Sequence, residues 1–137
     1  MQALTDTNFD INSSRAFRNL WKNEAFTDVT LVSMDGQDFK AHKVILSSSS
    51  NFFNHVFLRN SQPNLVLYLK GINYQQLEQI MEFIYNGQCE VNEEELHSFM
   101  ETAIELKIEK LINYEKTGIH VKTQNSCETY EEIRKKN

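Results

Sequence analysis

In residues 26–57 the apolar positions first follow the period of two that is typical of strands and then the spacing of a helix. Val29, Leu31 and Ser33 alternate with Thr30, Val32 and Met34, and several of these side chains are β-branched. This pattern is typical of a half-buried strand. Asp35-Gly36 predicts a two-residue hairpin turn, because both central residues of that turn need positive φ. Residues 38–43 predict the second strand, which runs directly into an apolar helix at Val44.

The four serines at positions 47–50 interrupt this helix. Serine is a weak helix former but a good cap, so we expect a break with Ser50 starting the next helix. A loop at Pro63 and a short apolar strand at 65–70 follow. The apolar residues of the second helix are Phe52, Phe53, Val56 and Phe57.

The second half of the chain is helical in pattern. Residues 75–86 carry apolar side chains at the i, i+3, i+4, i+7 spacing of a buried helix face, and Gly87 stands where a left-handed cap belongs. Asn92 is expected to open a further helix with Glu93–Glu95 in its first turn, and a short last helix surrounds Leu111. We therefore predict an α+β fold in which a small three-stranded sheet caps a cluster of about five to six helices.

The N-terminal segment mixes strand and helix signals. Phe9 and Ile11 alternate with polar neighbours, which predicts a short strand, and residues 12–14 are good helix caps. Phe17, Leu20 and Trp21 then share one helical face. We divide the chain into a flexible N-terminus at 1–8, a domain at 9–115 and a polar tail or linker at 116–137.

Composition narrows the class of protein. The chain has 137 residues, enough for one domain, and a formal net charge of -5, which argues against direct contact with nucleic acid. Cys89 and Cys127 are expected to be ordinary thiols of a reducing compartment. The sequence contains neither an apolar run long enough to span a membrane nor the apolar core of a signal peptide.

Catalytic and cofactor motifs are missing from the sequence. His42, His55, His97 and His120 have no metal-ligand spacing, and there is no glycine-rich phosphate loop or nucleophile elbow. We therefore expect no enzyme activity, no metal and no cofactor. We interpret His42 as a structural residue at the junction of strand and helix.

Two blocks of the sequence match the signature of a known family. The first consists of Asp28-Val29, Phe39, Ala41-His42-Lys43, Leu46, Ser50 and Phe53, and the second is Phe83-Ile84-Tyr85-Asn86-Gly87. With these motifs in this order, residues 9–115 closely resemble the BTB/POZ domain family. The resemblance implies the BTB/POZ fold and a function in binding proteins rather than in catalysis.

Three segments are also similar to the insect tramtrack-like group of this family, namely residues 26–31, 40–46 and 106–111. That group usually carries an early Trp-Asn-Asn segment, where this chain has Trp21-Lys22-Asn23 in another context. The resemblance to this group is therefore partial. It bears on whether the chain forms assemblies larger than a dimer.

The resemblance implies a homodimer whose interface contains the first helix and a strand before it. The residues that would form this dimer interface are Phe9, Ile11, Phe17, Leu20 and Trp21. The alternative is that these side chains pack on the core of their own chain, because Phe and Trp are favoured in both places. Periodicity cannot distinguish the two.

The resemblance also implies a charged pocket near the dimer interface, formed by Asp28 and Lys43. The alternative is a solvated ion pair, which would contribute less than about 1 kcal/mol. A buried pair would be more sensitive, since removing one partner costs about 3–5 kcal/mol.

From these features we expect a homodimerising protein-interaction module at the N-terminus of a nuclear transcription or chromatin regulator. A corepressor or other BTB proteins are the further partners that the resemblance implies. One alternative is a substrate adaptor for a cullin-type ubiquitin ligase, although loop residues 58–63 lack the acidic residue common in such adaptors. Another is a stand-alone BTB protein that heterodimerises with longer relatives, and the alternative location is the cytoplasm.

Overall fold

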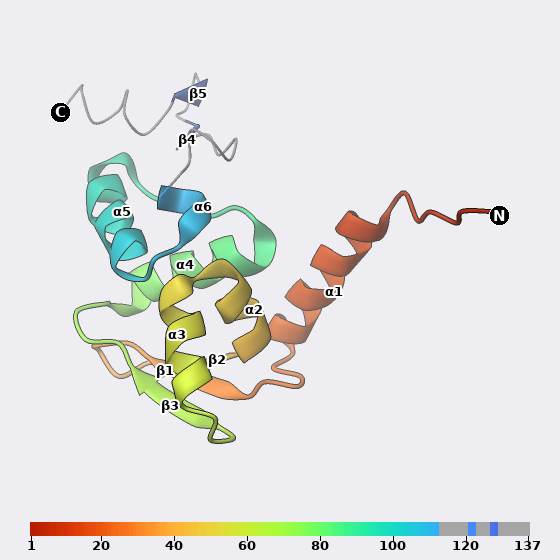
Figure 1. The fold of residues 1–137 in the computed structure, drawn as a ribbon. Coiled ribbons are helices and arrows are strands. Elements are labelled where there is room, and N and C mark those ends of the chain that lie inside the picture. Colours follow the sequence, from red (N-terminus) through yellow and green to blue (C-terminus); the bar gives the residue numbers. More distant parts are fainter. Residues whose placement is uncertain (113–120, 123–126, 129–137) are drawn as a thin grey trace. The chain divides into compact units, whose positions relative to one another are not determined.

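The computed structural model describes residues 1–112, 121–122 and 127–128 of the chain. This described part contains six α-helices, a 3-10 helix, a three-stranded sheet and a two-stranded sheet (Figure 1). The predicted α+β class is therefore confirmed. The chain divides into two compact units, one made of Met1–Ile45 with Gln62–Cys89 and one of Leu46–Ser61 with Glu90–Asn137.

The first unit contains the three-stranded sheet. Its strands are β1 (Val29–Val32), β2 (Asp38–Ala41) and β3 (Leu65–Tyr68), in the order β2-β1-β3. β1 pairs with β2 in antiparallel and with β3 in parallel orientation. Val29, Leu31 and Ala41 lie on one face and are buried, as predicted. Thr30, on the other face, is buried as well, so β1 is more deeply buried than the predicted half-buried strand.

The hairpin turn between β1 and β2 is longer than the predicted two-residue turn. The Gly36 N–H donates to the Ser33 carbonyl at 2.9 Å, and the Ser33 N–H donates to the Gln37 carbonyl at 2.9 Å. Three residues thus form the loop, and within it only Gly36 has positive φ, +82°. The prediction was wrong because a three-residue loop needs only one left-handed residue, and Asp-Gly satisfies both loop types.

The N-terminal helix α1 (Phe9–Lys22) replaces the predicted strand at Phe9 and Ile11 and begins before the predicted caps at 12–14. Residue 8 is its N-cap, and Asp10 places a negative charge in the first turn. A helix bonds its own backbone groups, whereas a strand needs a neighbouring strand, so the isolated segment is helical. No residue of α1 is buried.

The helix α4 (Tyr74–Asn86) completes the first unit and follows the predicted pattern. The Asn73 side chain accepts a hydrogen bond from the Gln76 N–H at its start, and Gly87 ends it with a φ of +77°. The predicted cap is therefore confirmed. Its buried face consists of Leu77, Ile80, Met81, Phe83 and Tyr85.

The second unit is mainly helical. It contains α3 (Asn51–Arg59), η1 (Glu93–Glu95), α5 (Leu96–Glu105), α6 (Glu109–Ile112) and the short pair β4 (Val121–Lys122) and β5 (Cys127–Glu128). The glutamates predicted as the first turn of an α-helix form a separate 3-10 turn instead. Most of the predicted tail at 116–137 lies outside the described residues. The helix α2 (Lys43–Ser49) begins in the first unit and ends in the second.

Ser50 holds the second unit together at the start of α3. Its hydroxyl accepts a hydrogen bond from the Phe53 N–H at 3.1 Å and donates one to the Leu106 carbonyl at 2.5 Å. Ser50 is buried, as are Phe53 and Phe57, whose rings stack with centroids 5.7 Å apart. The predicted break after α2, with Ser50 as the new cap, is confirmed.

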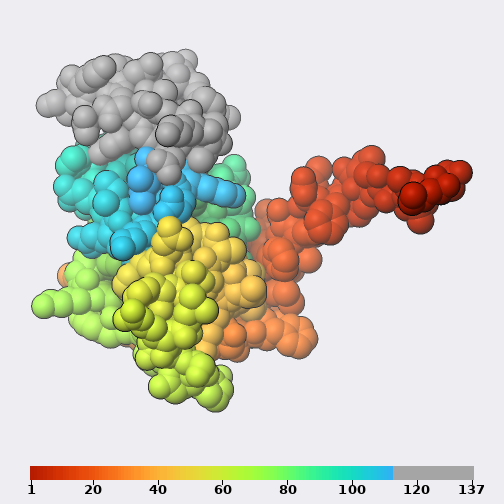
Figure 2. All heavy atoms as spheres, in the orientation of Figure 1, coloured from red at the N-terminus to blue at the C-terminus, as the bar shows by residue number. Residues whose placement is uncertain are grey.

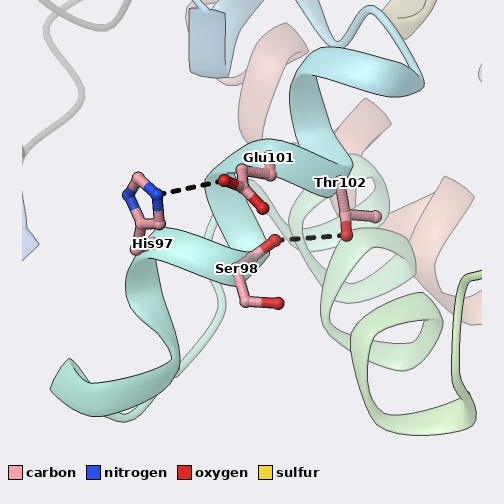
Figure 3. A network of polar contacts seen from close by, with 4 residues as sticks. All are labelled: His97, Ser98, Glu101 and Thr102. Carbon is pink, nitrogen blue, oxygen red and sulfur yellow. Dashed lines mark hydrogen bonds and ion pairs between the residues drawn. The ribbon is translucent and has the colours of Figure 1, made fainter.

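Two polar contacts within α5 are drawn in Figure 3, one between exposed side chains and one made by the buried Thr102. His97 Nε2 lies 3.0 Å from Glu101 Oε1, and the Thr102 hydroxyl donates to the Ser98 carbonyl at 3.2 Å. His97 and Glu101 are largely exposed, so their contact contributes little to stability. The stability of α5 comes instead from its buried face, which includes Phe99 and Met100.

We expect Ser50→Ala to lower the free energy of unfolding by about 1–3 kcal/mol, because it removes the cap of α3 and leaves the buried Leu106 carbonyl without its donor. Urea unfolding followed by circular dichroism measures the change. Ser47→Ala is the matched control, since Ser47 lies inside α2, is only half-buried, and alanine favours a helix. Equal stability of the two variants would contradict the role given to Ser50.

Candidate functional site

His42 directly follows β2, and its backbone N–H and both ring nitrogens have hydrogen-bond partners. Its Nε2 is 2.7 Å from the Ala25 carbonyl and its Nδ1 is 2.7 Å from the Tyr85 hydroxyl. Its backbone N–H donates to the same Tyr85 oxygen at 3.0 Å. A carbonyl oxygen only accepts hydrogen bonds, so Nε2 carries the hydrogen and donates it to Ala25. In the neutral ring, Nδ1 then accepts a hydrogen bond from the Tyr85 hydroxyl. The predicted structural role of His42 is confirmed, and we call this group of three residues the His42 clasp.

Burial changes the titration of Tyr85 and Cys89. Burial is the main cause that raises the pKa of Tyr85 from 10.0 to about 12. Burial also raises the pKa of Cys89 from 9.0 to about 11, with a smaller contribution from the charge of Glu82. Cys89 therefore stays a neutral thiol near neutral pH, which does not favour a nucleophile.

The helix α1 contacts the rest of the first unit mainly through its C-terminal end. Trp21 stacks on Tyr85 of α4, with ring centroids 5.0 Å apart and planes 10° from parallel. Trp21 and Leu20 are half-buried, whereas Phe9, Phe17 and Ile11 are 63%, 46% and 61% exposed. Figure 2 shows the atoms of α1, in red, open to the surroundings along most of the helix. Within the chain, the predicted interface residues thus separate into an anchored end and an exposed end.

The helical form of residues 9–22 changes which of these side chains share a face. Phe9 and Ile11 are two residues apart, which places them about 200° apart around a helix. Phe9 and Phe17 lie about 80° apart, with Leu20 between them. One face of α1 therefore carries Phe9, Phe17 and Leu20, and Ile11 lies on the other side.

Asp28 and Lys43, the predicted charged pocket, are close together in the first unit. The Lys43 backbone N–H donates to Asp28 Oδ1 at 2.7 Å, and the Lys43 ammonium donates to the Gln62 carbonyl at 2.8 Å. Asp28 is exposed and Lys43 half-buried. The Asp28 carboxylate thus satisfies the first free N–H of α2, where the helix dipole favours a negative charge.

Sequence reasoning identified His42 but missed its partner Tyr85. The sequence did carry a signal for this partner, because Tyr85 stands among the apolar positions of α4 and a buried hydroxyl needs a hydrogen-bond partner. Among the described residues, no three His, Cys, Asp or Glu side chains are placed together to hold a metal ion. Within the same residues, no helix combines the length and apolar character needed to cross a membrane.

A family model described as the BTB/POZ domain matches residues 17–121. The chain belongs to the BTB/POZ domain family. This family consists of protein-interaction modules and is not an enzyme family. BTB/POZ domains in general self-associate and bind other BTB proteins.

Relatives and a solved structure agree with this assignment. The chain is 39% identical over 103 residues to the Longitudinals lacking protein-like of Drosophila melanogaster, covering 75% of this chain and 80% of the relative. It is 36% identical over 104 residues to the tramtrack alpha isoform of the same organism, covering 76% of this chain but only 13% of tramtrack. The BTB domain of zebrafish PATZ1 has a TM-score of 0.74 at 22% identity, covering 83% of this chain and 93% of that domain, which shows the fold. The predicted similarity to the tramtrack-like group is confirmed.

We expect Tyr85→Phe to lower the free energy of unfolding by about 1–3 kcal/mol, because the buried N–H and Nδ1 of His42 lose their partner. Tyr68→Phe is the matched control, since Tyr68 is exposed on β3. Urea unfolding of both variants, followed by circular dichroism, measures the difference. If the two variants lose the same stability, the His42 clasp does not hold the first unit together.

The stability of this BTB/POZ domain is also expected to fall between about pH 10 and pH 12, because the pKa of Tyr85 is 10.0 when unfolded and about 12 when folded. The unfolded chain loses this proton first, so the stabilisation is complete below the lower value and is lost as pH rises through the higher one. Urea unfolding across this range measures the fall.

The measurement uses a Cys89→Ser background, because the raised pKa of Cys89 titrates in an overlapping range. Tyr85→Phe in that background should show a weaker dependence on pH. The same dependence with and without the Tyr85 hydroxyl would contradict the assignment.

Proposed function

We propose that this BTB/POZ domain is a homodimerising module of a nuclear transcription or chromatin regulator. The observation that carries the proposal is the uncovered apolar face of α1, formed by Phe9, Phe17 and Leu20. Single exposed apolar residues are common, but two exposed phenylalanines on one helix face are typical of an interaction surface.

A second copy of the same chain is the partner that fits this face. A symmetric dimer places the same surface on both sides, so an apolar helix face can cover itself. Such a contact removes Phe9 and Phe17 from water, and aromatic side chains contribute strongly to interfaces. The half-buried Trp21 would then support the interface from within its own chain by stacking on Tyr85.

The regulatory setting is supported by the relatives. One of them is named zinc finger protein chinmo of Drosophila melanogaster. This chain is 36% identical to it over 105 residues, which cover 17% of the length of chinmo. In a longer regulator of that kind, dimerisation joins two DNA-binding modules. Linking them raises avidity for clustered sites by about 10²–10⁴ without new contacts.

We expect the chain to have a mass of about 32 kDa in solution, twice its 16.1 kDa, when size exclusion is combined with light scattering. Phe17→Asp should give a folded monomer, because Phe17 is exposed within the chain and a charge there opposes burial in a dimer. Circular dichroism checks that the variant is folded.

The matched control is Ile104→Asp, which places the same charge at an exposed apolar position of α5. It should leave the mass unchanged. A wild-type chain that stays monomeric at all concentrations, or a Phe17→Asp variant that keeps the dimer mass, would contradict the proposal. A larger discrete assembly would instead indicate oligomers beyond the dimer.

A further inference from the structure

A hollow of about 240 Å³ lies in the first unit beside β2. It is lined by Trp21, Lys22 and Glu24 at the end of α1, by residues 38–40 of β2 and by Glu82 of α4. None of these residues belongs to the His42 clasp or to the proposed dimer face, although Trp21 stacks on Tyr85 of the clasp. Three carboxylates and two ammonium groups surround it, which gives a net charge of -1.

The carboxylates of this hollow are not neutralised by the lysines beside them. The Lys40 ammonium donates to the Thr30 hydroxyl at 2.9 Å. In the described part of the chain, neither Glu24 nor Asp38 forms an ion pair. Glu82 accepts a hydrogen bond from the Asn86 amide one turn further along α4. Glu24 and Asp38 are thus two negative side chains at the hollow that lack a positive partner.

The strand β2, which lines the hollow, has an open backbone edge. β2 is an edge strand, since the order is β2-β1-β3. Ser33 and Gln37 form a hydrogen-bonded pair, and such pairs alternate along an antiparallel ladder, so the next one is Leu31 with Phe39. The N–H and C=O groups of Asp38 and Lys40 therefore point away from β1. Among the described residues they have no partner.

The hollow also offers an aromatic surface. The Trp21 ring stacks on Tyr85 and at the same time lines the hollow, and it is only half-buried. A guanidinium group stacks on an aromatic ring and donates hydrogen bonds to carboxylates with one planar group. Trp21 with Glu24 and Asp38 therefore suits an arginine side chain better than an apolar or acidic one.

The geometry points to a docking site for an extended peptide segment of a partner protein that adds as a strand to β2 and places an arginine in the hollow. Strand addition takes its affinity from main-chain hydrogen bonds at an open edge and its specificity from pockets for alternate side chains. Here Asp38 and Lys40 supply the main-chain groups, and Glu24, Asp38 and Trp21 supply the pocket. This site is separate from self-association and does not depend on it.

The test uses the full chain and the peptide acetyl-Thr-Val-Thr-Arg-Thr-Val-Thr-amide. Trp21 is the single tryptophan of the chain, so its fluorescence reports on the hollow. The amide signals of Asp38 and Lys40 in the ¹⁵N-labelled chain report on the edge of β2. We expect both to change saturably with the peptide.

Two altered peptides separate the two parts of the proposal. Replacing arginine by glutamate should abolish the response, because the hollow carries a net negative charge. Methylating the backbone nitrogens of the arginine and of the threonine after it removes donors on both edges of the strand, and should also abolish the response. An equal response to the glutamate peptide would overturn the arginine pocket, and an equal response to the methylated peptide would overturn strand addition.

The double variant Glu24→Gln with Asp38→Asn should weaken binding at least about tenfold, since it removes both unpaired charges. Glu105→Gln is the matched control, because it removes one exposed carboxylate of α5 outside the hollow. It should bind like the unchanged chain. Unchanged binding by the double variant, or no response of Trp21 and of the two amides at millimolar peptide, would overturn the inference.

Light scattering on the same samples separates this site from self-association. The mass should stay the same when the peptide binds. A mass that falls on peptide addition would show that Trp21 reports dissociation of the dimer, which overturns the docking site while leaving the dimer proposal in place.

Discussion

The Tyr85 hydroxyl is the contact on which the first unit depends most. It binds both the backbone and the ring of His42, and the His42 ring continues to the Ala25 carbonyl. Three segments distant in sequence are thereby joined: the turn after α1, the end of β2 and the helix α4. Trp21 stacks on the same tyrosine ring, so the position of the N-terminal helix depends on it as well. Because these polar groups are largely buried, each is costly to leave unpaired.

The elements that the sequence predicted well are those whose signal is local. Ser50 marks a helix start through its own hydroxyl, and Gly87 marks a helix end because its left-handed backbone is costly for other residues. The N-terminal strand was predicted wrongly because two alternating apolar residues do not specify a partner for their backbone. The turn at Asp35-Gly36 was predicted one residue too short because the same dipeptide suits two loop lengths.

The candidate sites were harder to predict than the fold because they depend on residues far apart in the sequence. The hollow combines side chains of α1, β2 and α4, which no short motif connects. The resemblance to a family predicts that the N-terminal segment is an interaction element, but only its helical backbone shows that Phe9 and Ile11 lie on different sides. Asp28 and Lys43 lie close together because a backbone N–H joins them, and the charged pocket that the resemblance implies stays a prediction.

The parallel pairing of β1 with β3 has a consequence for the order in which the chain folds. Val29 pairs with Leu65, so the chain between these strands includes all of α2 and α3 before it returns to the sheet. The hairpin of β1 and β2 closes a loop of a few residues, whereas β3 must close a far longer one, which is slower. The sheet is therefore completed late, and until then β1 presents an unpaired edge on which a newly made chain is most exposed to aggregation.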